Sequence, residues 1–159
     1  MKKLARVELK LKKYGNFQTQ IQGSTDCVKL LLPFFYNMMD YKEQFYVVFL
    51  SRSNNVQTVS DFSPSYTDTT ATAAMKVSEG GRSATVVDIM QILQGAILCN
   101  ASAMIVAHNH PSGNLQPSLN DKVMTDKLKQ AAKLLDIDLL DHIILTSIGH
   151  FSFANEGIL

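Results

Sequence analysis

Residues 100–121 read NASAMIVAHNHPSGNLQPSLND, and this stretch decides the expected fold. Residues 101–107 are small or apolar, and their number suits a buried β-strand. The segment 108–114 predicts a loop, because proline, glycine and asparagine follow one another closely in it. Ser118 predicts the start of a helix, since serine caps helix N-termini and Asp121 three residues later completes a capping box. We therefore expect a buried strand whose carboxyl end opens into a polar loop.

Alternating and helical apolar patterns continue on both sides of this strand. The expected elements are, in chain order, a strand over 6–12, a helix over 24–40, strands over 45–50 and 56–62, a helix over 89–97, the strand over 101–107, a helix from 118 to about 135, and strands over 137–146 and 151–153. Residues 63–72 are rich in serine and threonine and predict a loop. Helices between strands indicate a layered α/β domain with a mixed sheet.

Two of the expected helices are amphipathic. The helix over 89–97 carries apolar residues at offsets of 0, 3, 4, 7 and 8, and either Thr85 or Asp88 can cap it. The helix that begins at Ser118 is expected to bury one face against the sheet. The residues expected on that face are Leu119, Val123, Leu128, Ala131 and Leu135.

Composition and charge indicate one globular domain without a nucleic-acid surface. The 159 residues are 46% hydrophobic and 18% charged, and the net charge of +1 provides no bulk attraction to nucleic acid. The first 13 residues carry six of the basic side chains against the single acid Glu8. We interpret these lysines as the solvated face of an edge strand, because no aromatic residues interleave them as stacking platforms would.

The two cysteines and the lack of long apolar runs suggest a cytoplasmic protein. Cys27 and Cys99 are far apart, and each lies in an apolar stretch, so we expect reduced and buried thiols rather than a disulfide framework. We also expect no signal peptide, since Arg6 and Glu8 interrupt any apolar region near the N-terminus. No apolar run approaches the roughly 18 residues of a membrane helix.

The polar loop holds a potential set of metal ligands. His108 and His110 are two residues apart, so in extended backbone both imidazoles point to the same side. Asp121 falls in the first turn of the next helix, whose N-terminus faces that loop. Two imidazoles and a carboxylate form a three-ligand zinc set that leaves the fourth position for water. The alternative is a capping box between Ser118 and Asp121 with no role in binding, but capping does not account for the histidines.

The string from His108 to Asp121 resembles the JAMM motif, His-x-His-Pro-x6-Ser-x-x-Asp, in its RadC form. The flanks resemble RadC proteins too, at Asn100-Ala101, at Thr125 and Leu128, at 141–144 and at 151–153. This resemblance implies the JAB/MPN fold, a three-layer, cytidine-deaminase-like sandwich with a central mixed β-sheet. The domain would span 42–159, with 1–41 part of it or appended to it.

The resemblance also implies a role for each site residue. His108, His110 and Asp121 would bind Zn²⁺, and Glu43 would be the general base that takes a proton from the zinc-bound water. Ser118 would donate a hydrogen bond to the developing oxyanion. His142 and His150 are interpreted as structural. The chain departs from the RadC pattern at 89–91, where Ile-Met-Gln replaces the usual Pro-Arg-Glu.

Two functions remain open at this stage. The first is a zinc metallohydrolase that cleaves peptide or isopeptide bonds in an unidentified protein or peptide. The alternative is a non-catalytic metal-binding module associated with DNA repair or mobile-element maintenance. A zinc nucleobase deaminase is excluded, because it requires His-x-Glu followed by Pro-Cys-x-x-Cys and the chain has neither. No membrane or strong nucleic-acid partner is expected, and the oligomeric state is left open.

Overall fold

The computed structural model describes residues 19–57, 59–60, 71–72, 74–80 and 86–159. The expected strand over 6–12, most of the expected loop over 63–72 and the alternative cap Thr85 lie outside the described residues. The helices are α1 (Ser24–Phe35), α2 (Ile89–Leu98) and α3 (Leu119–Lys133). The strands are β1 (Gln44–Leu50), β2 (Val56–Gln57), β3 (Val59–Ser60), β4 (Ala71–Thr72), β5 (Met75–Glu79), β6 (Ala103–Asn109), β7 (Asp138–Thr146) and β8 (Gly149–Ser152).

The described strands form a mixed sheet in the order β2-β1-β6-β7-β8, with β5 also paired to β1. The β6–β7 pair is parallel, whereas β1 pairs with β6 and β7 pairs with β8 in the antiparallel sense. The expected hairpin is confirmed, since β1 and β2 pair antiparallel. Strand β3 pairs only with β4 in a small second sheet.

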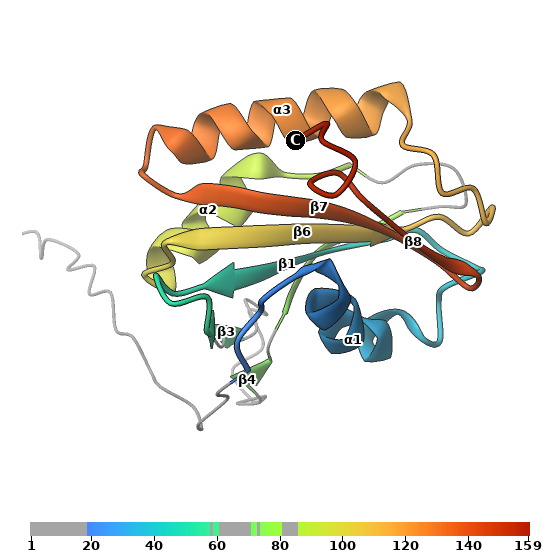
Figure 1. The fold of residues 1–159 in the computed structure, drawn as a ribbon, viewed down its shortest axis with the longest axis horizontal. Coiled ribbons are helices and arrows are strands. Elements are labelled where there is room, and N and C mark those ends of the chain that lie inside the picture. The colour runs from blue at the N-terminus through green and yellow to red at the C-terminus, as the bar shows by residue number, and fades with distance from the viewer. Residues whose placement is uncertain (1–18, 58, 61–70, 73, 81–85) are drawn as a thin grey trace, which may run out of the picture.

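Helices cover both faces of the larger sheet (Figure 1), which confirms the expected three-layer α/β sandwich. Helix α1 packs on one face, where Leu31 and Phe35 meet inward side chains of β1, β6 and β7. Helices α2 and α3 pack on the other face, where Ile92 and Leu128 join a second apolar cluster with Phe45. Every residue of the two central strands β1 and β6 is buried, because helices shield both of their faces.

Helix α2 lies unusually close to the sheet at Gly95. A Cβ atom on Gly95 would come within 2.8 Å of the ring of Phe49, which is itself fully buried. Only glycine permits this approach. The helix begins at the cap Asp88, whose side chain accepts hydrogen bonds from the backbone N–H groups of Met90 and Gln91, so that expected cap is confirmed.

Several element boundaries differ from the sequence-based expectation. The strand expected over 56–62 is divided into β2 and β3, and β8 begins at Gly149 rather than at 151. Helix α1 ends at Phe35 rather than near Asp40, because Pro33 lies inside it and residues 36–41 turn back toward the sheet. Strand β6 continues through His108 to Asn109, where a loop was expected. The reason is pairing on both sides: β6 lies between β1 and β7, and His108 is aligned with Phe45 and Ile144.

The buried face of α3 was predicted only in part, and strand β5 was not predicted. Leu128 is buried as expected, but Leu119, Val123 and Leu135 are exposed, and the other buried residues are Thr125 and Ala132. The helix meets β7 along a narrow stripe, so the most apolar face is not the contact face. Strand β5 was not expected, although its alternation of Met75 and Val77 with polar residues is a short strand signal.

Cys27 and Cys99 are both buried and unpaired, as expected. Burial raises the pKa of the Cys27 thiol to about 12 and that of Cys99 to about 11, so both thiols stay protonated. Within the described part of the chain, no helix combines the length and the apolar character needed to cross a membrane.

Candidate metal centre

The expected ligand set comes together at the carboxyl end of β6. His108 is the last residue but one of β6 and pairs with Ile144 of β7. His110 directly follows the strand, and Asp121 lies in the first turn of α3. Their donor atoms all lie within 4.8 Å of one another. The two Nε2 atoms are 2.9 Å apart, and the Asp121 oxygens lie 3.3 Å from His108 Nε2 and 3.6 Å from His110 Nε2.

The loop after β6 fixes the tautomer of His110. Its Nδ1 lies 2.6 Å from the backbone carbonyl oxygen of Asn114, which can only accept, so Nδ1 carries the proton. The chain returns to His110 because Gly113 adopts a positive φ of 76°, and its N–H donates to the His110 carbonyl. In the neutral ring, Nε2 therefore presents a lone pair to the other ligands.

A buried chain of hydrogen bonds fixes the tautomer of His108 in the same way. The Thr125 hydroxyl donates to the Asp121 carbonyl oxygen at 2.6 Å, so it accepts from Nδ1–H of His142 at 2.6 Å. His142 Nε2 is then unprotonated and accepts from Nδ1–H of His108 at 2.8 Å. This leaves Nε2 of His108 as a lone-pair donor. The ring of His142 is itself held by stacking on Phe153, with centroids 4.6 Å apart.

The surroundings shift the pKa values of the ligand set in different directions. Burial lowers the pKa of His108 to about 4, and burial also lowers the pKa of His142 well below its usual value. The hydrogen bond with Asp121 raises the pKa of His110. Burial alone would raise the pKa of Asp121, but hydrogen bonds with His110 and Ser118 and the nearby His108 hold it far below its usual value. His108 is therefore neutral and Asp121 ionised near neutral pH.

When both rings are neutral, three electron-rich atoms converge on one point, and the raised pKa of His110 shows that this point attracts a cation. Both imidazoles turn their lone pairs inward, because each ring's proton is engaged on its far side by Asn114 or His142. The carboxylate adds a negative charge at the same point. Such an arrangement is repulsive unless a cation lies among the three donors, so the residues fit a metal ion with open positions for other ligands.

The two other expected site residues lie close to this ligand set. Ser118 and Asp121 form the expected capping box: the Ser118 side chain accepts from Asp121 N–H, and the Asp121 side chain accepts from Ser118 N–H at 2.7 Å. Capping and ligand placement are therefore not alternatives, because the box orients the Asp121 carboxylate. Glu43 directly precedes β1, is partly exposed, and is near enough to His110 to raise the pKa of that imidazole.

Comparison with known proteins agrees with this architecture. Residues 21–158 match the family model of the RadC-like JAB domain. The chain belongs to the RadC-like JAB family. A UPF0758 protein of Flavobacterium johnsoniae is 35% identical over 150 residues, which cover 94% of this chain and 55% of that protein. A UPF0758 protein of Chromobacterium violaceum is 40% identical over 117 residues, which cover 74% of this chain and 46% of that protein.

Sequence identity to the relatives is higher over shorter segments. A UPF0758 protein of Thermotoga maritima is 48% identical over 68 residues, which cover 43% of this chain and 31% of that protein. The RadC-like chain spans about half the length of the Flavobacterium relative and less of the others. The names of these relatives state no activity, so the chemistry of the site has to be argued from its residues.

Sequence reasoning missed three residues that hold the site together. His142 was interpreted as structural, with contact to a ligand only as the alternative, and it is this alternative that the contact with His108 favours; Thr125 was quoted only as part of the resemblance. Asn109 was placed in a loop between the two histidines, yet it is fully buried. A weak signal existed: polar residues at 109, 125 and 142 interrupt apolar or amphipathic elements, where polar side chains need partners.

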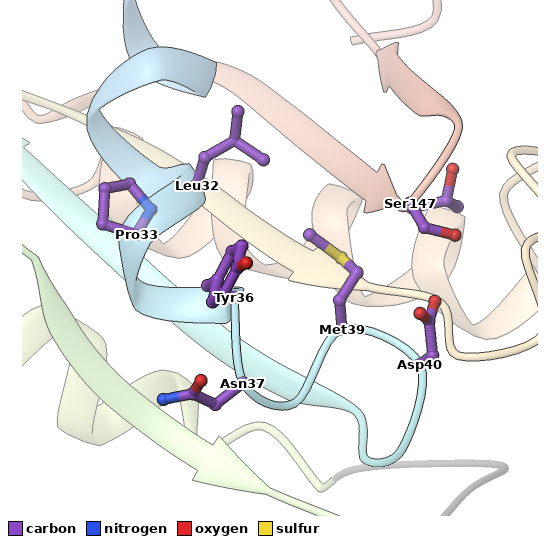
Figure 2. A pocket seen from close by; sticks show the side chains of 8 residues that line it. Leu32, Pro33, Tyr36, Asn37, Met39, Asp40 and Ser147 are labelled. Atoms are coloured by element: carbon purple, nitrogen blue, oxygen red, sulfur yellow. The ribbon is translucent and has the colours of Figure 1, made fainter.

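A pocket of about 740 Å³ lies beside the site without containing the three ligands. Figure 2 shows its lining side chains, which come from α1, the turn after α1 and the end of β7. The lining residues are Leu32, Pro33, Tyr36, Asn37, Met39, Asp40, Thr146 and Ser147. Its surface is mainly apolar, in contrast to the ligand set.

Proposed function

We propose that this RadC-like domain is a zinc-dependent metallohydrolase that cleaves peptide or isopeptide bonds. The observation that supports it best is the convergence of three potential metal-binding atoms, His108 Nε2, His110 Nε2 and an oxygen of the Asp121 carboxylate. Tetrahedral zinc with bonds of about 2.0–2.1 Å requires neighbouring ligand atoms roughly 3.3 Å apart. The measured separations of 2.9, 3.3 and 3.6 Å lie around that value. Two imidazoles and one carboxylate are typical of catalytic rather than structural zinc sites.

In the proposed reaction, each side chain of the site has a separate chemical role. A zinc ion bound by the three donors would supply Lewis acidity and lower the pKa of a coordinated water toward 7. Glu43 would accept a proton from a water that attacks the carbonyl carbon, and would return it to the amine nitrogen as the C–N bond breaks. The Ser118 hydroxyl donates to the oxyanion that develops on the substrate. His142 and Thr125 keep the His108 lone pair directed at the site.

The test compares metal content and turnover in two variants with similar chemistry. Zinc per chain is measured by elemental analysis, and hydrolysis is measured on a peptide library and on lysine-linked isopeptides. Glu43→Gln is expected to keep the zinc and lose about 10²- to 10⁴-fold in rate, because glutamine cannot accept the proton. Asp121→Asn is expected to weaken the zinc itself, because a neutral amide is a poorer ligand.

Glu156→Gln is the matched control, since Glu156 is an exposed glutamate near the C-terminus and makes the same chemical change elsewhere. It should leave both readouts unchanged. If Glu43→Gln loses zinc as readily as Asp121→Asn, Glu43 is a ligand and the open-site mechanism is wrong. A wild-type chain that binds zinc but cleaves none of these substrates would support a non-catalytic metal-binding module instead.

A further inference from the structure

Asn109 is the last residue of β6 and lies between the two histidine ligands. Its side chain is fully buried. Because successive side chains of a strand point to opposite faces, Asn109 faces the α1 layer while His108 faces the α3 layer. None of the roles assigned so far to the ligand set uses Asn109.

The side chain of Asn109 makes a dense set of hydrogen bonds to one backbone segment. Its Oδ1 accepts from the Gln44 N–H at 2.8 Å. Its Nδ2 donates to the carbonyl oxygens of Met39 and Lys42, each at 2.8 Å, with the Met38 carbonyl at 3.3 Å. An amide group is the side chain that offers an acceptor and two donors at these separations, and its orientation is set by the partners.

These hydrogen bonds hold the backbone on both sides of Glu43. The carbonyl of Lys42 precedes it and the N–H of Gln44 follows it, and both are bonded to Asn109. The Glu43 carbonyl itself accepts from the Gly80 N–H at 2.9 Å. Residues 36–43 belong to neither a helix nor a strand, so their position depends on such contacts. Met39 and Asp40, on the same segment, line the pocket in Figure 2.

We propose that Asn109 is a positioning residue that fixes Glu43 relative to the metal ligands. This inference rests on the proposed function for its catalytic meaning. Consecutive residues of one rigid central strand would then set both halves of the site. His108 presents a metal ligand on one face, and Asn109 clamps the segment that carries the base on the other face. The carboxyl end of β6 would thereby set the distance between the metal and Glu43.

The first measurement does not depend on activity. Amide hydrogen exchange is compared between the wild type and Asn109→Ala, after thermal melting shows that each is folded. The amides of Gln44 and Gly80 are expected to exchange at least about tenfold faster in the variant, while those of Val106 and Ile143 in the sheet keep their protection. Unchanged exchange at Gln44 and Gly80 would overturn the proposal.

Asn109→Asp separates the clamp from simple loss of volume. Aspartate fills the same space and still accepts from Gln44, but it cannot donate to the carbonyls of Met39 and Lys42. We expect it to loosen the segment as Asn109→Ala does. Since Gln44 keeps its acceptor in this variant, the amide of Gly80 is the readout, and exchange of Gly80 at the wild-type rate in Asn109→Asp would show that the clamp is wrong. This variant also decides the matter should Asn109→Ala fail to fold.

The second measurement is turnover with zinc content on the same samples. Both Asn109 variants are expected to keep wild-type zinc and to lose at least about tenfold in kcat. Adding Asn109→Ala to Glu43→Gln should cause little further loss, because the two act through one group. Loss of turnover only in proportion to lost zinc would overturn the positioning role. If the wild type shows no turnover, the proposed function fails, and hydrogen exchange alone then judges the clamp.

Thr146→Val is the matched control. Thr146 is buried at the end of the neighbouring strand β7, and its hydroxyl bonds to the backbone of Ile148 and Gly149. The substitution therefore removes the buried hydrogen bonds of the Thr146 hydroxyl, and it removes none of those between Asn109 and the segment that contains Glu43. Exchange at Gln44 and turnover are expected to stay within twofold of wild type. An equal loss in Thr146→Val and Asn109→Ala would show a general loosening and overturn the specific clamp.

Discussion

The two faces of the sheet at the end of β6 are both polar and buried, yet they are built in different ways. On the α3 face, His108, His142 and Thr125 form a line of side-chain contacts that ends on a backbone carbonyl. On the α1 face, the side chain of Asn109 bonds to backbone groups of the segment before β1 and of the first residue of β1. The first arrangement decides which ring nitrogen carries a proton. The second decides where a segment of chain lies.

This contrast shows how one strand end can serve two purposes. Side-chain networks tune the electronic state of a ligand, and their members are replaceable only by groups with the same donors and acceptors. A backbone clamp tunes geometry, and it tolerates changes in the clamped side chains.

The largest effect is expected from removing a ligand. His110→Ala and His108→Ala should each lower zinc per chain at least tenfold, because two remaining donors hold the metal poorly. The measurement is elemental analysis of the purified chain. His150→Ala is the control, since His150 is exposed on β8 and is not among the ligand set. Zinc retained at the wild-type level in both ligand variants would refute the assigned site.

A smaller effect is expected from Thr125→Val, which changes the tautomer without touching a ligand. Without the hydroxyl, Nδ1–H of His142 has no acceptor, so the ring favours a proton on Nε2 and donates to His108. His108 would then carry its own proton on Nε2, toward the metal. Zinc affinity, measured by competition with a chelator, should fall about 10- to 100-fold, which is about 1.4–2.7 kcal/mol.

Thr125→Ser is the matched control, because it keeps the hydroxyl and should retain affinity close to wild type. Nitrogen chemical shifts of the imidazoles in the metal-free chain provide a second readout. They should report a proton on His108 Nδ1 in the wild type and on Nε2 in Thr125→Val. Equal affinities for the Val and Ser variants would show that the hydroxyl does not set the tautomer.

The smallest effect is expected at Glu79, on the exposed side of the segment that Asn109 holds. Hydrogen bonds from Lys76, Gln44 and Lys42 lower the pKa of Glu79 to about 2. A lowered carboxyl pKa stabilises the fold above its unfolded value of 4.5, and this contribution is lost as the pH falls toward 2. Since Glu79 and its lysine partners are exposed, Glu79→Gln should lower the free energy of unfolding by at most about 1 kcal/mol at pH 7.

Urea unfolding at pH 7 and pH 3 checks the sign. The difference between wild type and Glu79→Gln should be fully present at pH 7 and clearly smaller at pH 3, because the unfolded chain is already protonated there while Glu79 of the folded chain loses its charge only near pH 2. Raised salt should reduce it at pH 7, because exposed charges are screened. A difference that grows on acidification would contradict the assigned direction of the pKa shift.

What could be predicted from the sequence was mostly local. The caps at Asp88 and Ser118 follow from short-range hydrogen bonding, and the β1–β2 hairpin follows from two apolar runs around a turn. The gathering of His108, His110 and Asp121 also followed from spacing, because a strand end, a short loop and a helix N-terminus leave few arrangements.

Only the tertiary structure decided the partners of these residues. Nothing local to 108–110 shows that β6 extends to Asn109, because that extension depends on pairing with β1 and β7. The same holds for Thr125 as a buried residue of α3, which depends on the position of His142, 17 residues along the chain. Spacing along the chain determines which groups are near one another in sequence. Contacts between distant segments determine which ring nitrogen carries a proton and where the segment that contains Glu43 lies.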